Sequence, residues 1–283
     1  MKYYILFNPL SASGDGKGKA EELKNYLKDD ELIFQDITKM DSYEDFANEI
    51  DSDSRIMLCG GDGTLNRFIN EAGSLIEKFS IYYFASGTGN DFLRDTPEWE
   101  SKKPLCLDEY LKVLPEVTVK GKTYKFINGV GYGIDGYCCE VGDKLREKSD
   151  KPVNYAGIAI KGLLFHYKPA NAQITVDGKT QSFKNVWLAP TMFGHYYGGG
   201  MKPTPEQDRF KTKDQVSTMV MYGSGKLKTL MIFPNIFKGT HVTHEDCVKV
   251  MSGKEITVKF DRPTALQIDG ETVLGVTEYT VKI

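Results

Sequence analysis

Residues 55–66 read RIMLCGGDGTLN, an apolar run that passes directly into three glycines around an aspartate. The run has the length and aliphatic content of a buried β-strand, and the apolar spacing after Thr64 is typical of a helix. Glycines between a strand and a helix let backbone N–H groups approach an anion closely at the helix N-terminus. The stretch therefore predicts a strand–loop–helix unit that binds phosphate.

The surrounding hundred residues repeat this unit. Apolar runs alternate with helical patterns, and Ser42 followed by Asp45 is typical of the start of a helix. The alternation predicts a parallel sheet with helices on both faces, in which ligands bind at the carboxyl ends of the strands. We expect strands at residues 3–7, 32–37, 55–59 and 81–85, and helices at residues 20–28, 42–50 and 64–76.

Three of the expected strands run into polar loops, at residues 8–19, 60–64 and 86–91. We expect these loops to meet at one edge of the sheet and to form a site. The first loop adds cations such as Lys17 that suit a polyphosphate, or it is simply a mobile polar loop. In the second loop, Asp62 fits either a divalent metal or hydroxyl proton, or a cap on a helix. No Walker A spacing occurs, which excludes a P-loop NTPase.

The pattern changes near residue 115, where β-hairpins become frequent. We expect hairpins at residues 117–127 and around Asp177-Gly178, preceded by a helix at residues 107–114. Further helices are expected at residues 132–148, 154–167 and 226–237. The remaining apolar runs read as strands, so this half is β-sandwich-like or mixed α/β.

Two further motifs have ordinary structural interpretations. Residues 131–136 fit GxGxxG, but they lie behind a hairpin and outside the βαβ region, which argues against a dinucleotide site. Asp269-Gly270 stands between two apolar runs, as in a common hairpin turn. From the residues alone, the turn is the favoured interpretation of Asp269.

The composition narrows the classes of partner and the location that we expect for the protein. The 283 residues carry 36 Lys and Arg against 39 Asp and Glu, a net charge of −3. This balance argues against a nucleic-acid binder, whose affinity would rest on a basic face. The apolar stretch at residues 155–165 falls short of the roughly 20 residues of a spanning helix. Five cysteines without a CxxC pair indicate reduced thiols, so a cytoplasmic protein is expected.

Taken in order, the motifs resemble the diacylglycerol kinase catalytic-domain family of bacterial lipid kinases, which is similar in fold to sphingosine kinases and more distantly to NAD kinases. The resemblance spans nearly the whole chain. It implies an α/β fold, with a doubly wound, NAD-kinase-like nucleotide-binding domain at residues 1–115 and a β-sandwich-like lipid-substrate domain at residues 116–275. The C-terminal strand, 276–283, is free to return to the first domain. The motifs are NP at 8–9, GGDGTLN at 60–66, GTGNDF at 87–92, FIN at 126–128 with GID at 133–135, GGGM at 198–201 and IDGE at 268–271.

This resemblance implies an ATP-dependent lipid kinase that uses Mg²⁺, with diacylglycerol as the first candidate acceptor and phosphatidic acid as its product. A soluble-acceptor kinase similar to NAD kinase and a non-catalytic nucleotide- or lipid-binding regulator remain alternatives. The lipid would be met at the membrane surface by peripheral contact, without a span and without nucleic acid. A homodimer is left open.

The resemblance also assigns roles to residues. It favours Asp269 as the general base over a mere turn, with Asp62 as the alternative base and Lys17 as a phosphate contact. The expected catalytic carboxylates are Asp269, Asp62, Asp135 and Glu271, and the expected metal ligands are Asp91, Asp62 and Asp214. The expected nucleotide-binding residues are Asn8, Lys17, Gly60, Gly61, Gly63, Thr64, Gly87, Thr88, Gly89 and Asn90.

Some positions depart from the family pattern. Arg67 stands where Glu is frequent, Ser86 where Pro is usual, and Asp214-Gln215 where some members have an Asp-Gly linked to a structural Mg²⁺.

Two clusters of residues fit either a role at the membrane or an ordinary structural role. Basic residues at a helix end could approach anionic headgroups or be solvated, and apolar ones could line a lipid entrance or pack in the core. These are Lys144, Arg146, Lys148 and Lys151, and Met192, Phe193, Tyr196 and Tyr197.

Overall fold

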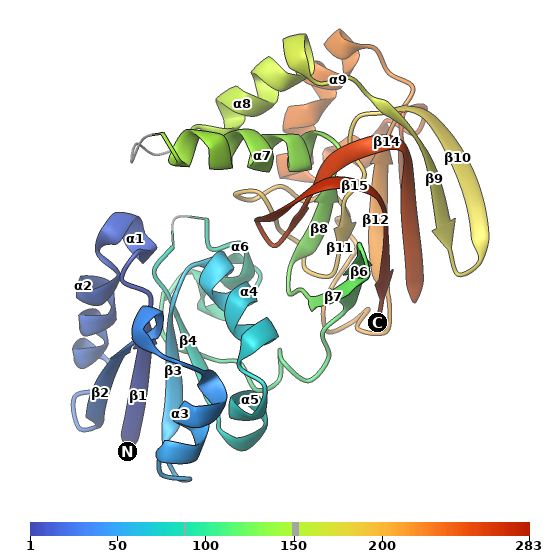
Figure 1. Cartoon of the computed structure of the whole chain (residues 1–283). Helices are drawn as coiled ribbons and strands as arrows, with labels where there is room; N and C mark the ends of the chain where they lie inside the picture. Colours follow the sequence, from blue (N-terminus) through green and yellow to red (C-terminus); the bar gives the residue numbers. More distant parts are fainter. Residues whose placement is uncertain (88, 149–152) are drawn as a thin grey trace. The chain divides into compact units, whose positions relative to one another are not determined.

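The computed structural model describes residues 1–87, 89–148 and 153–283. The chain divides into two compact units, Met1–Leu114 and Pro115–Ile283, and each has its own β-sheet (Figure 1). Within the described ranges, no helix is long and apolar enough to cross a membrane.

The first unit is built on a five-stranded sheet in the order β2-β1-β3-β4-β5. The first four strands in this order are parallel and β5 is antiparallel. Because β2 lies on one side of β1 and β3 on the other, the order reverses between β1 and β3, where such sheets bind ligands at the strand ends. The strands are β1 (Lys2–Phe7), β2 (Glu31–Asp36), β3 (Arg55–Gly60), β4 (Ile81–Ala85) and β5 (Leu105–Cys106).

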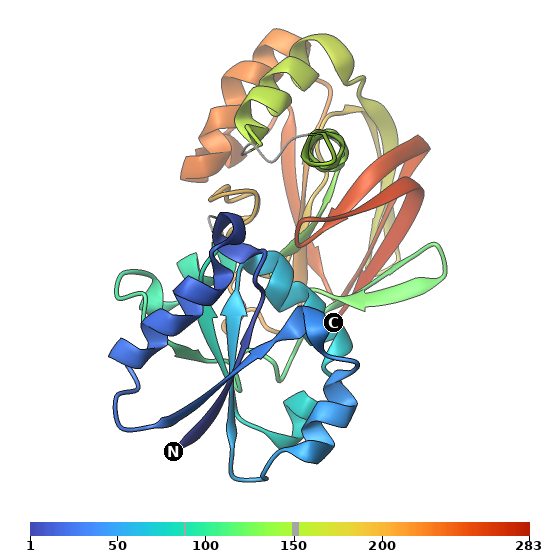
Figure 2. The same cartoon turned by 60° about the vertical axis from the view of Figure 1, so that its left-hand side comes forward.

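Helices cover this sheet, with α2 and α4 on opposite sides of it (Figures 1 and 2). Alternate residues of β1, among them Ile5 and Phe7, pack against Ala20 and Leu23 in one apolar cluster. Ser42 accepts a hydrogen bond from the Asp45 N–H and caps α3, as predicted. The helical segments are α1 (Ser11–Gly14), α2 (Gly16–Glu21), η1 (Glu22–Asn25), η2 (Ile37–Lys39), α3 (Tyr43–Glu49), α4 (Asp62–Glu71), α5 (Ser74–Lys78), α6 (Asp91–Arg94) and η3 (Pro97–Trp99).

The predicted helix at residues 107–114 is wrong. Leu107 instead extends the β4–β5 pairing, since its N–H donates to the Ile81 carbonyl at 2.7 Å. The Asp108 side chain then accepts the Ile81 N–H at 2.9 Å. These bonds hold the segment against the sheet edge, and turns and bends follow at residues 108–113.

The second unit is built on a ten-stranded sheet in which β14 belongs to two parts. The first half of β14 pairs with β9, and its second half, after an irregularity between Lys259 and Thr264, pairs with β8. A strand that changes partners in this way makes the corner of a sandwich. The strands are β6 (Glu116–Val119), β7 (Lys122–Lys125), β8 (Gly129–Tyr132), β9 (Ala170–Val176), β10 (Lys179–Val186), β11 (Thr191–Met192), β12 (Val216–Met221), β13 (Val248–Gly253), β14 (Glu255–Ile268) and β15 (Glu271–Lys282).

The C-terminal strand does not return to the first sheet. β15 pairs along its length with β14, and Tyr279–Lys282 also pair with β6. Its inward residues Val276, Tyr279 and Val281 are buried in the main apolar cluster of this unit, which explains why the strand stays there.

The helices of the second unit lie over a separate apolar cluster that includes Leu163, Trp187 and Ile232. The three helices predicted after residue 130 are present, with shifted ends. The helical segments are α7 (Ile134–Arg146), α8 (Tyr155–Lys161), the π-helical turn η4 (Gly162–His166), α9 (Lys226–Ile232), η5 (Phe233–Lys238) and η6 (Thr240–Thr243).

The GxGxxG match at residues 131–136 joins β8 to α7 and serves packing. A Cβ on Gly133 would lie 2.5 Å from the Trp187 carbonyl oxygen, and one on Gly136 would lie 1.8 Å from that of Ala265. These glycines therefore let α7 approach its neighbours closely. Since β8 is antiparallel to both of its neighbours, the βαβ setting of a dinucleotide fingerprint is missing, as expected.

Candidate functional site

The three polar loops of the first unit are bonded to one another. Asn8 Nδ2, after β1, donates to Thr64 Oγ1 at 3.2 Å. The hydroxyl groups of Ser11 and Ser86 are also hydrogen bonded, at 3.2 Å. The prediction that these loops meet at one edge of the sheet is therefore confirmed.

Two glycines bring the second and third loops into backbone contact. A Cβ built on Gly87 would lie 2.7 Å from the Gly61 Cα and 2.9 Å from the Asn90 Oδ1. No side chain fits at such a distance, so the two backbones touch only because both residues are glycine. Asn90 Nδ2 closes the third loop by donating to the Gly87 carbonyl at 2.7 Å. Thr88 lies outside the described residues.

The N-terminus of α4 opens at these loops. Its N-cap is Gly61, which offers no side chain to bond the N–H groups of the first turn. The first N–H groups of a helix have no partner within the helix, and together with the helix dipole they attract anions. A ten-residue helix that begins here without a side-chain cap is suited to hold a phosphate.

Asp62 holds the third loop in place. Its Oδ2 accepts the Asp91 N–H at 2.9 Å, and its Oδ1 accepts the Phe92 N–H at 3.1 Å. The carboxylate thus caps α6. Asp62 therefore caps a helix, as one of the two interpretations predicted. The helix is α6, after the third loop, and not α4.

Two cations near the loops have different surroundings. Lys17 is exposed on α2. Arg67 is exposed on α4 and binds Glu71 one turn later, with its Nε 2.9 Å from Glu71 Oε1. The charge reversal at Arg67 is therefore balanced within its own helix.

In the second unit, Asp269 and Gly270 form the two-residue turn between β14 and β15, since Ile268 pairs with Glu271. Their φ angles of 46° and 98° are both positive, as in a type I′ turn. The hairpin interpretation is therefore correct. Glu271 is exposed at the start of β15.

The Asp269 side chain does more than fit the turn. It is only 8% exposed, and its carboxylate accepts three backbone N–H groups, from Ile127 at 2.7 Å and from Asn128 and Gly129 at 2.9 Å each. These bonds fix the orientation of the carboxylate and compensate its removal from water. The buried Asp269 carboxylate thus binds the backbone of the FIN motif and of the glycine that follows it.

Arg209 binds a carbonyl group of the same segment. Arg209 is only 5% exposed, its Nη1 donates to the Ile127 carbonyl at 2.9 Å, and its guanidinium lies over the Phe193 ring. Residues 127–129 therefore lie between a carboxylate that accepts their N–H groups and a guanidinium that binds a carbonyl. No role of Arg209 is predicted from the sequence, because nothing there distinguishes it from the exposed lysines at 211 and 213.

Asp135 is buried near the start of α7. Tyr197 donates to its Oδ2 at 2.5 Å, and a Cβ on Gly131 would meet both this carboxylate and the Gln267 amide. Burial raises the pKa of Asp135 to about 7, and the Tyr197 hydrogen bond only partly opposes this effect. Such a carboxyl can bind or release a proton near neutral pH.

Comparison with known proteins agrees with this architecture. Residues 2–118 match the family model of the diacylglycerol kinase catalytic domain, and residues 128–283 match that of the YegS C-terminal NAD kinase beta sandwich-like domain. The chain belongs to the family of the YegS C-terminal NAD kinase beta sandwich-like domain, whose model covers more than half of it, and its first unit matches the diacylglycerol kinase catalytic domain. The resemblance to bacterial lipid kinases and the expected fold class are thereby confirmed, and the protein is a lipid kinase.

Several relatives of this lipid kinase carry related names. A Bacillus subtilis protein named "Putative lipid kinase YtlR" is 26% identical over 244 residues, which cover 80% of this chain and 76% of the relative. A Mycobacterium tuberculosis protein named "Diacylglycerol kinase" is 24% identical over 253 residues, covering 85% and 80%. A crystal structure described as a putative diacylglycerol kinase from Bacillus anthracis has the same fold, with a TM-score of 0.65, 18% identity and coverage of 99% and 93%.

Two carboxylates beside the glycine loops are candidates for a metal that arrives with the substrate. Mg²⁺ commonly uses one or two carboxylates together with substrate phosphates. Asp62 and Asp91, beside the glycine loops, meet that requirement. Among the described residues, no group of three His, Cys, Asp or Glu side chains could hold an ion by itself. Asp214 is exposed in a turn before β12 and belongs to no such group.

Titration of Asp135 should appear in the stability of the kinase. Because its folded pKa of about 7 lies above the ordinary value of 3.8, the folded chain binds this proton more tightly than the unfolded chain. The free energy of unfolding should therefore fall as pH rises between these values, by up to a few kcal/mol. Asp135→Asn removes this contribution.

The test is a series of urea unfolding curves from about pH 4 to pH 8. The stability of Asp135→Asn relative to the wild type should increase with pH across this range. Asp214→Asn, at an exposed site, should follow the wild type. Parallel profiles for Asp135→Asn and the wild type would show that Asp135 is already ionised in the folded kinase at low pH.

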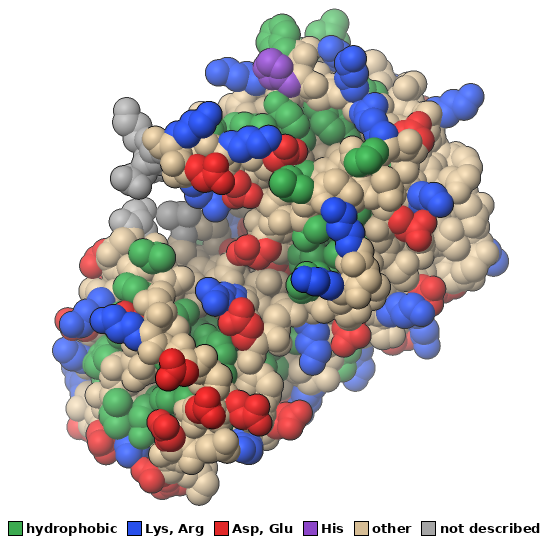
Figure 3. Space-filling view, viewed as in Figure 1, with side chains coloured by type: hydrophobic (Ala, Val, Ile, Leu, Met, Phe, Trp, Pro, Cys, Tyr) green, Lys and Arg blue, Asp and Glu red, His purple; other side chains and the backbone are tan. Residues whose placement is uncertain are grey.

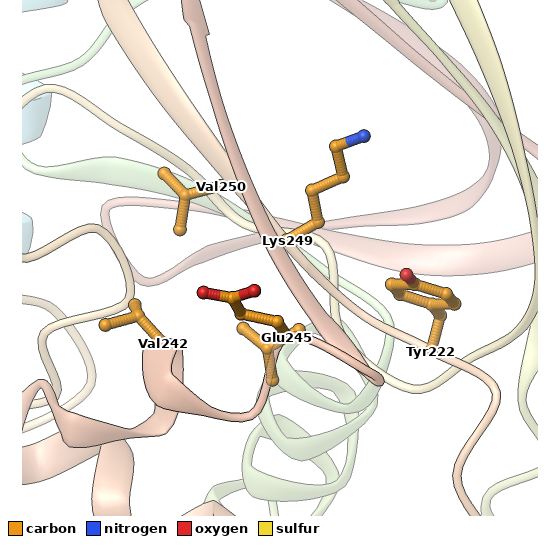
Figure 4. Close-up of a pocket in the computed structure, with 6 residues that line it drawn as sticks. Tyr222, Val242, Glu245, Lys249 and Val250 are labelled. Atoms are coloured by element: carbon orange, nitrogen blue, oxygen red, sulfur yellow. The ribbon is translucent and has the colours of Figure 1, made fainter.

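A hollow of about 380 Å³ lies beside β13 and η6, outside all of the motifs (Figure 4). The Lys249 ammonium turns away from Glu245 and donates to Gln181 Oε1 at 2.7 Å. The hollow thus presents valines and one carboxylate, which suit neither a nucleotide nor an anionic headgroup. Its lining residues are Tyr222, Val242, Glu245, Val248, Lys249 and Val250.

Proposed function

We propose that this lipid kinase transfers the γ-phosphate of ATP to the free hydroxyl of diacylglycerol, giving phosphatidic acid and ADP. The observation that carries the proposal is the buried Asp269 carboxylate, which three backbone N–H groups hold in the IDGE motif of the family. The name of the Mycobacterium tuberculosis relative supports diacylglycerol as the acceptor. The lipid would be met at a membrane surface to which the kinase binds peripherally.

In this proposal, the first unit binds the nucleotide. The N–H groups of the first turn of α4 bind the phosphates, and the glycines at 61 and 87 leave room for them. Asp62 and Asp91 would hold Mg²⁺, which supplies charge neutralisation on the phosphates when it is bound. Asp62 also fixes the loop after β4 through its two bonds to α6.

The second unit supplies the base. Asp269 accepts the proton of the lipid hydroxyl while that oxygen bonds to the γ-phosphorus, and the bond from phosphorus to the bridging oxygen of ADP breaks. Asp62 is the alternative base. Both carboxylates already accept backbone N–H groups on both oxygens, so their bonding does not distinguish them. The motif position favours Asp269.

The test measures Mg²⁺-dependent transfer of labelled γ-phosphate in mixed micelles. Diacylglycerol and other lipid hydroxyls serve as acceptors, with NAD assayed in parallel. Labelled phosphatidic acid as the main product is the expected result. Transfer only to another lipid would overturn diacylglycerol, and transfer only to NAD would favour a soluble-acceptor kinase. Nucleotide binding without transfer to any acceptor would favour a regulator.

A further inference from the structure

The helical side of the second unit exposes an unusual amount of apolar surface. Leu227 and Met231, one turn apart on α9, are 72% and 70% exposed, and Phe165 on η4 is 72% exposed. Pro234 continues the α9 stripe at helical spacing and is also exposed. These residues, with the exposed Ile160 of α8, are here named the apolar face.

These helices already bury a different side. Thr229 and Ile232 of α9 and Leu163 of η4 are buried on the inner side of the same segments. A surface helix normally has one apolar stripe toward the core and a polar outer side. Here the outer side is apolar as well, and no residue of the described chain covers it. Exposed apolar patches of this kind mark interaction surfaces.

The segments that carry the apolar face lie side by side. Lys226 Nζ, at the start of α9, donates to the Leu164 carbonyl of η4 at 2.9 Å. Figures 1 and 2 both show α8 and α9 adjacent at the top of the second unit. In the same region, Figure 3 shows apolar side chains interspersed with Lys and Arg. The exposed residues therefore form one surface.

The charged residues of the two segments that carry this surface have one sign. Residues 153–169 and 223–244 contain five lysines and neither Asp nor Glu. Lys228 is paired with Asp246, just beyond the second segment. An apolar surface whose own segments carry only basic charges complements an anionic bilayer, because the apolar side chains enter the boundary of headgroups and acyl chains while lysines meet the lipid charges.

A basic hollow of about 370 Å³ adjoins η4. Two of its cations, Lys168 and Arg262, form no ion pair with any described residue. Its one carboxylate, Glu140, is 2.5 Å from the Lys144 ammonium and is thereby neutralised. The hollow can accept a lipid phosphate beside the apolar face. It is lined by Tyr137, Glu140, His166, Tyr167, Lys168, Arg262, Pro263, Thr264 and Ala265.

We propose that the kinase docks on anionic membranes through the apolar face, with the hollow at Lys168 and Arg262 taking the phosphate of an anionic phospholipid. This inference rests on the proposed function, which places the acceptor in a membrane. The basic cluster predicted at the end of α7 is a weaker candidate. Lys144 there pairs with Glu140, Arg146 lies 3.4 Å from Asp143, and Lys151 is outside the described residues.

Flotation of the purified full chain with vesicles tests the docking directly. The vesicles contain equal parts of phosphatidylglycerol and phosphatidylcholine, or phosphatidylcholine alone. The double substitution Leu227→Gln and Met231→Gln should weaken binding to anionic vesicles by about tenfold or more, since two large apolar side chains lose their burial. Leu274→Gln is the matched control, because Leu274 is 54% exposed in the same unit but outside the apolar face.

Two further variants test the contribution of charge to membrane binding. Lys168→Gln and Arg262→Gln should each weaken binding to anionic vesicles by about fivefold, and neither should change the weak binding to phosphatidylcholine. Binding to anionic vesicles should also fall as salt rises. Unchanged vesicle binding in the Leu227/Met231 variant would overturn the docking surface. Full retention of binding by both charge variants would overturn the phosphate site.

A second assay separates docking from catalysis. On a water-soluble short-chain diacylglycerol, the Leu227/Met231 variant should phosphorylate as fast as the wild type, while its rate on long-chain diacylglycerol in anionic vesicles should fall with binding. Equal losses on both acceptors would point to a folding or catalytic defect and contradict a docking role. If the wild type phosphorylates neither acceptor, the proposed function fails, and flotation still decides the docking surface.

Discussion

Asp269→Asn is expected to lower the rate of phosphoryl transfer by about a hundredfold to ten-thousandfold, the range typical for loss of a general base. The substitution keeps the size of the side chain. An amide oxygen can still accept the Asn128 and Gly129 N–H groups that Oδ1 binds, each at 2.9 Å. The amide nitrogen, however, is a donor and would face the Ile127 N–H. Some stability should therefore be lost along with the base.

Asp177 provides a matched control for that loss of stability. It begins the Asp-Gly turn between β9 and β10, where Asp177 and Gly178 have φ angles of 46° and 79°. Its Oδ1 accepts the backbone N–H groups of Lys254 and Glu255 at 2.9 Å each. The same change is thus made in the same kind of turn, in the same unit, outside every motif of the site.

Unfolding curves and transfer rates of the two variants are measured together. Asp177→Asn should keep its transfer rate and lose less stability than Asp269→Asn, because the amide oxygen can still accept both N–H groups that Oδ1 binds. Asp269→Asn should lose both stability and rate. Equal rate losses would mean that hairpin stability, and not proton transfer, explains the effect. A normal rate in Asp269→Asn, combined with a collapse in Asp62→Asn, would assign the base to Asp62.

The part of the site in the first unit could be predicted from the sequence, because it depends on local loops and on the topology of the parallel sheet. Each loop follows its own strand, and parallel pairing brings the carboxyl ends of neighbouring strands together. The contact between Gly61 and Gly87 and the bond from Asn8 to Thr64 follow from this arrangement. The bonds from Asp62 to α6 could not be predicted, because they depend on the exact approach of one loop to the next.

The part of the site in the second unit depends on contacts between residues far apart in the chain. Asp269 binds residues about 140 positions earlier, and Arg209 binds the same segment from about 80 positions away. Local pattern could show the turn at Asp269 but not the three N–H groups that its carboxylate accepts. It also missed β8, because a four-residue strand with two glycines resembles a loop. The wrong helix at 107–114 has the same cause, since the long-range bond from the Ile81 N–H to Asp108 outweighs local helical spacing.

Gly87→Ala is expected to have a large effect on the nucleotide half of the site, although it adds only one methyl group. The new Cβ would lie 2.7 Å from the Gly61 Cα, so the two loops must separate. Overpacking of this kind typically costs about 1–3 kcal/mol of stability. A displacement of about 1 Å at a catalytic group can lower the rate about a hundredfold. We therefore expect weaker ATP binding and a rate loss of that order.

Two other glycines separate crowding from the mere addition of a methyl group. On Gly89 in the same loop, a Cβ would meet only Asp62 Oδ2 at 3.5 Å, an ordinary contact, so Gly89→Ala should leave the free energy of unfolding unchanged. Gly225, the N-cap of α9, has a φ of −75° and nothing within 4 Å, so Gly225→Ala should leave transfer unchanged.

Calorimetric titration with ATP, together with urea unfolding, decides among the glycine variants. The Gly87→Ala kinase should unfold at lower urea and bind ATP more weakly than the other two. If Gly87→Ala binds ATP as the wild type does, then backbone contact between the two loops is not what shapes the phosphate site. If it loses ATP binding without losing stability, the methyl group occupies the place of the phosphate itself, and the glycine serves the ligand and not the fold. That second outcome would still place the nucleotide at the N-terminus of α4, because the only loop contacts changed are those that border it.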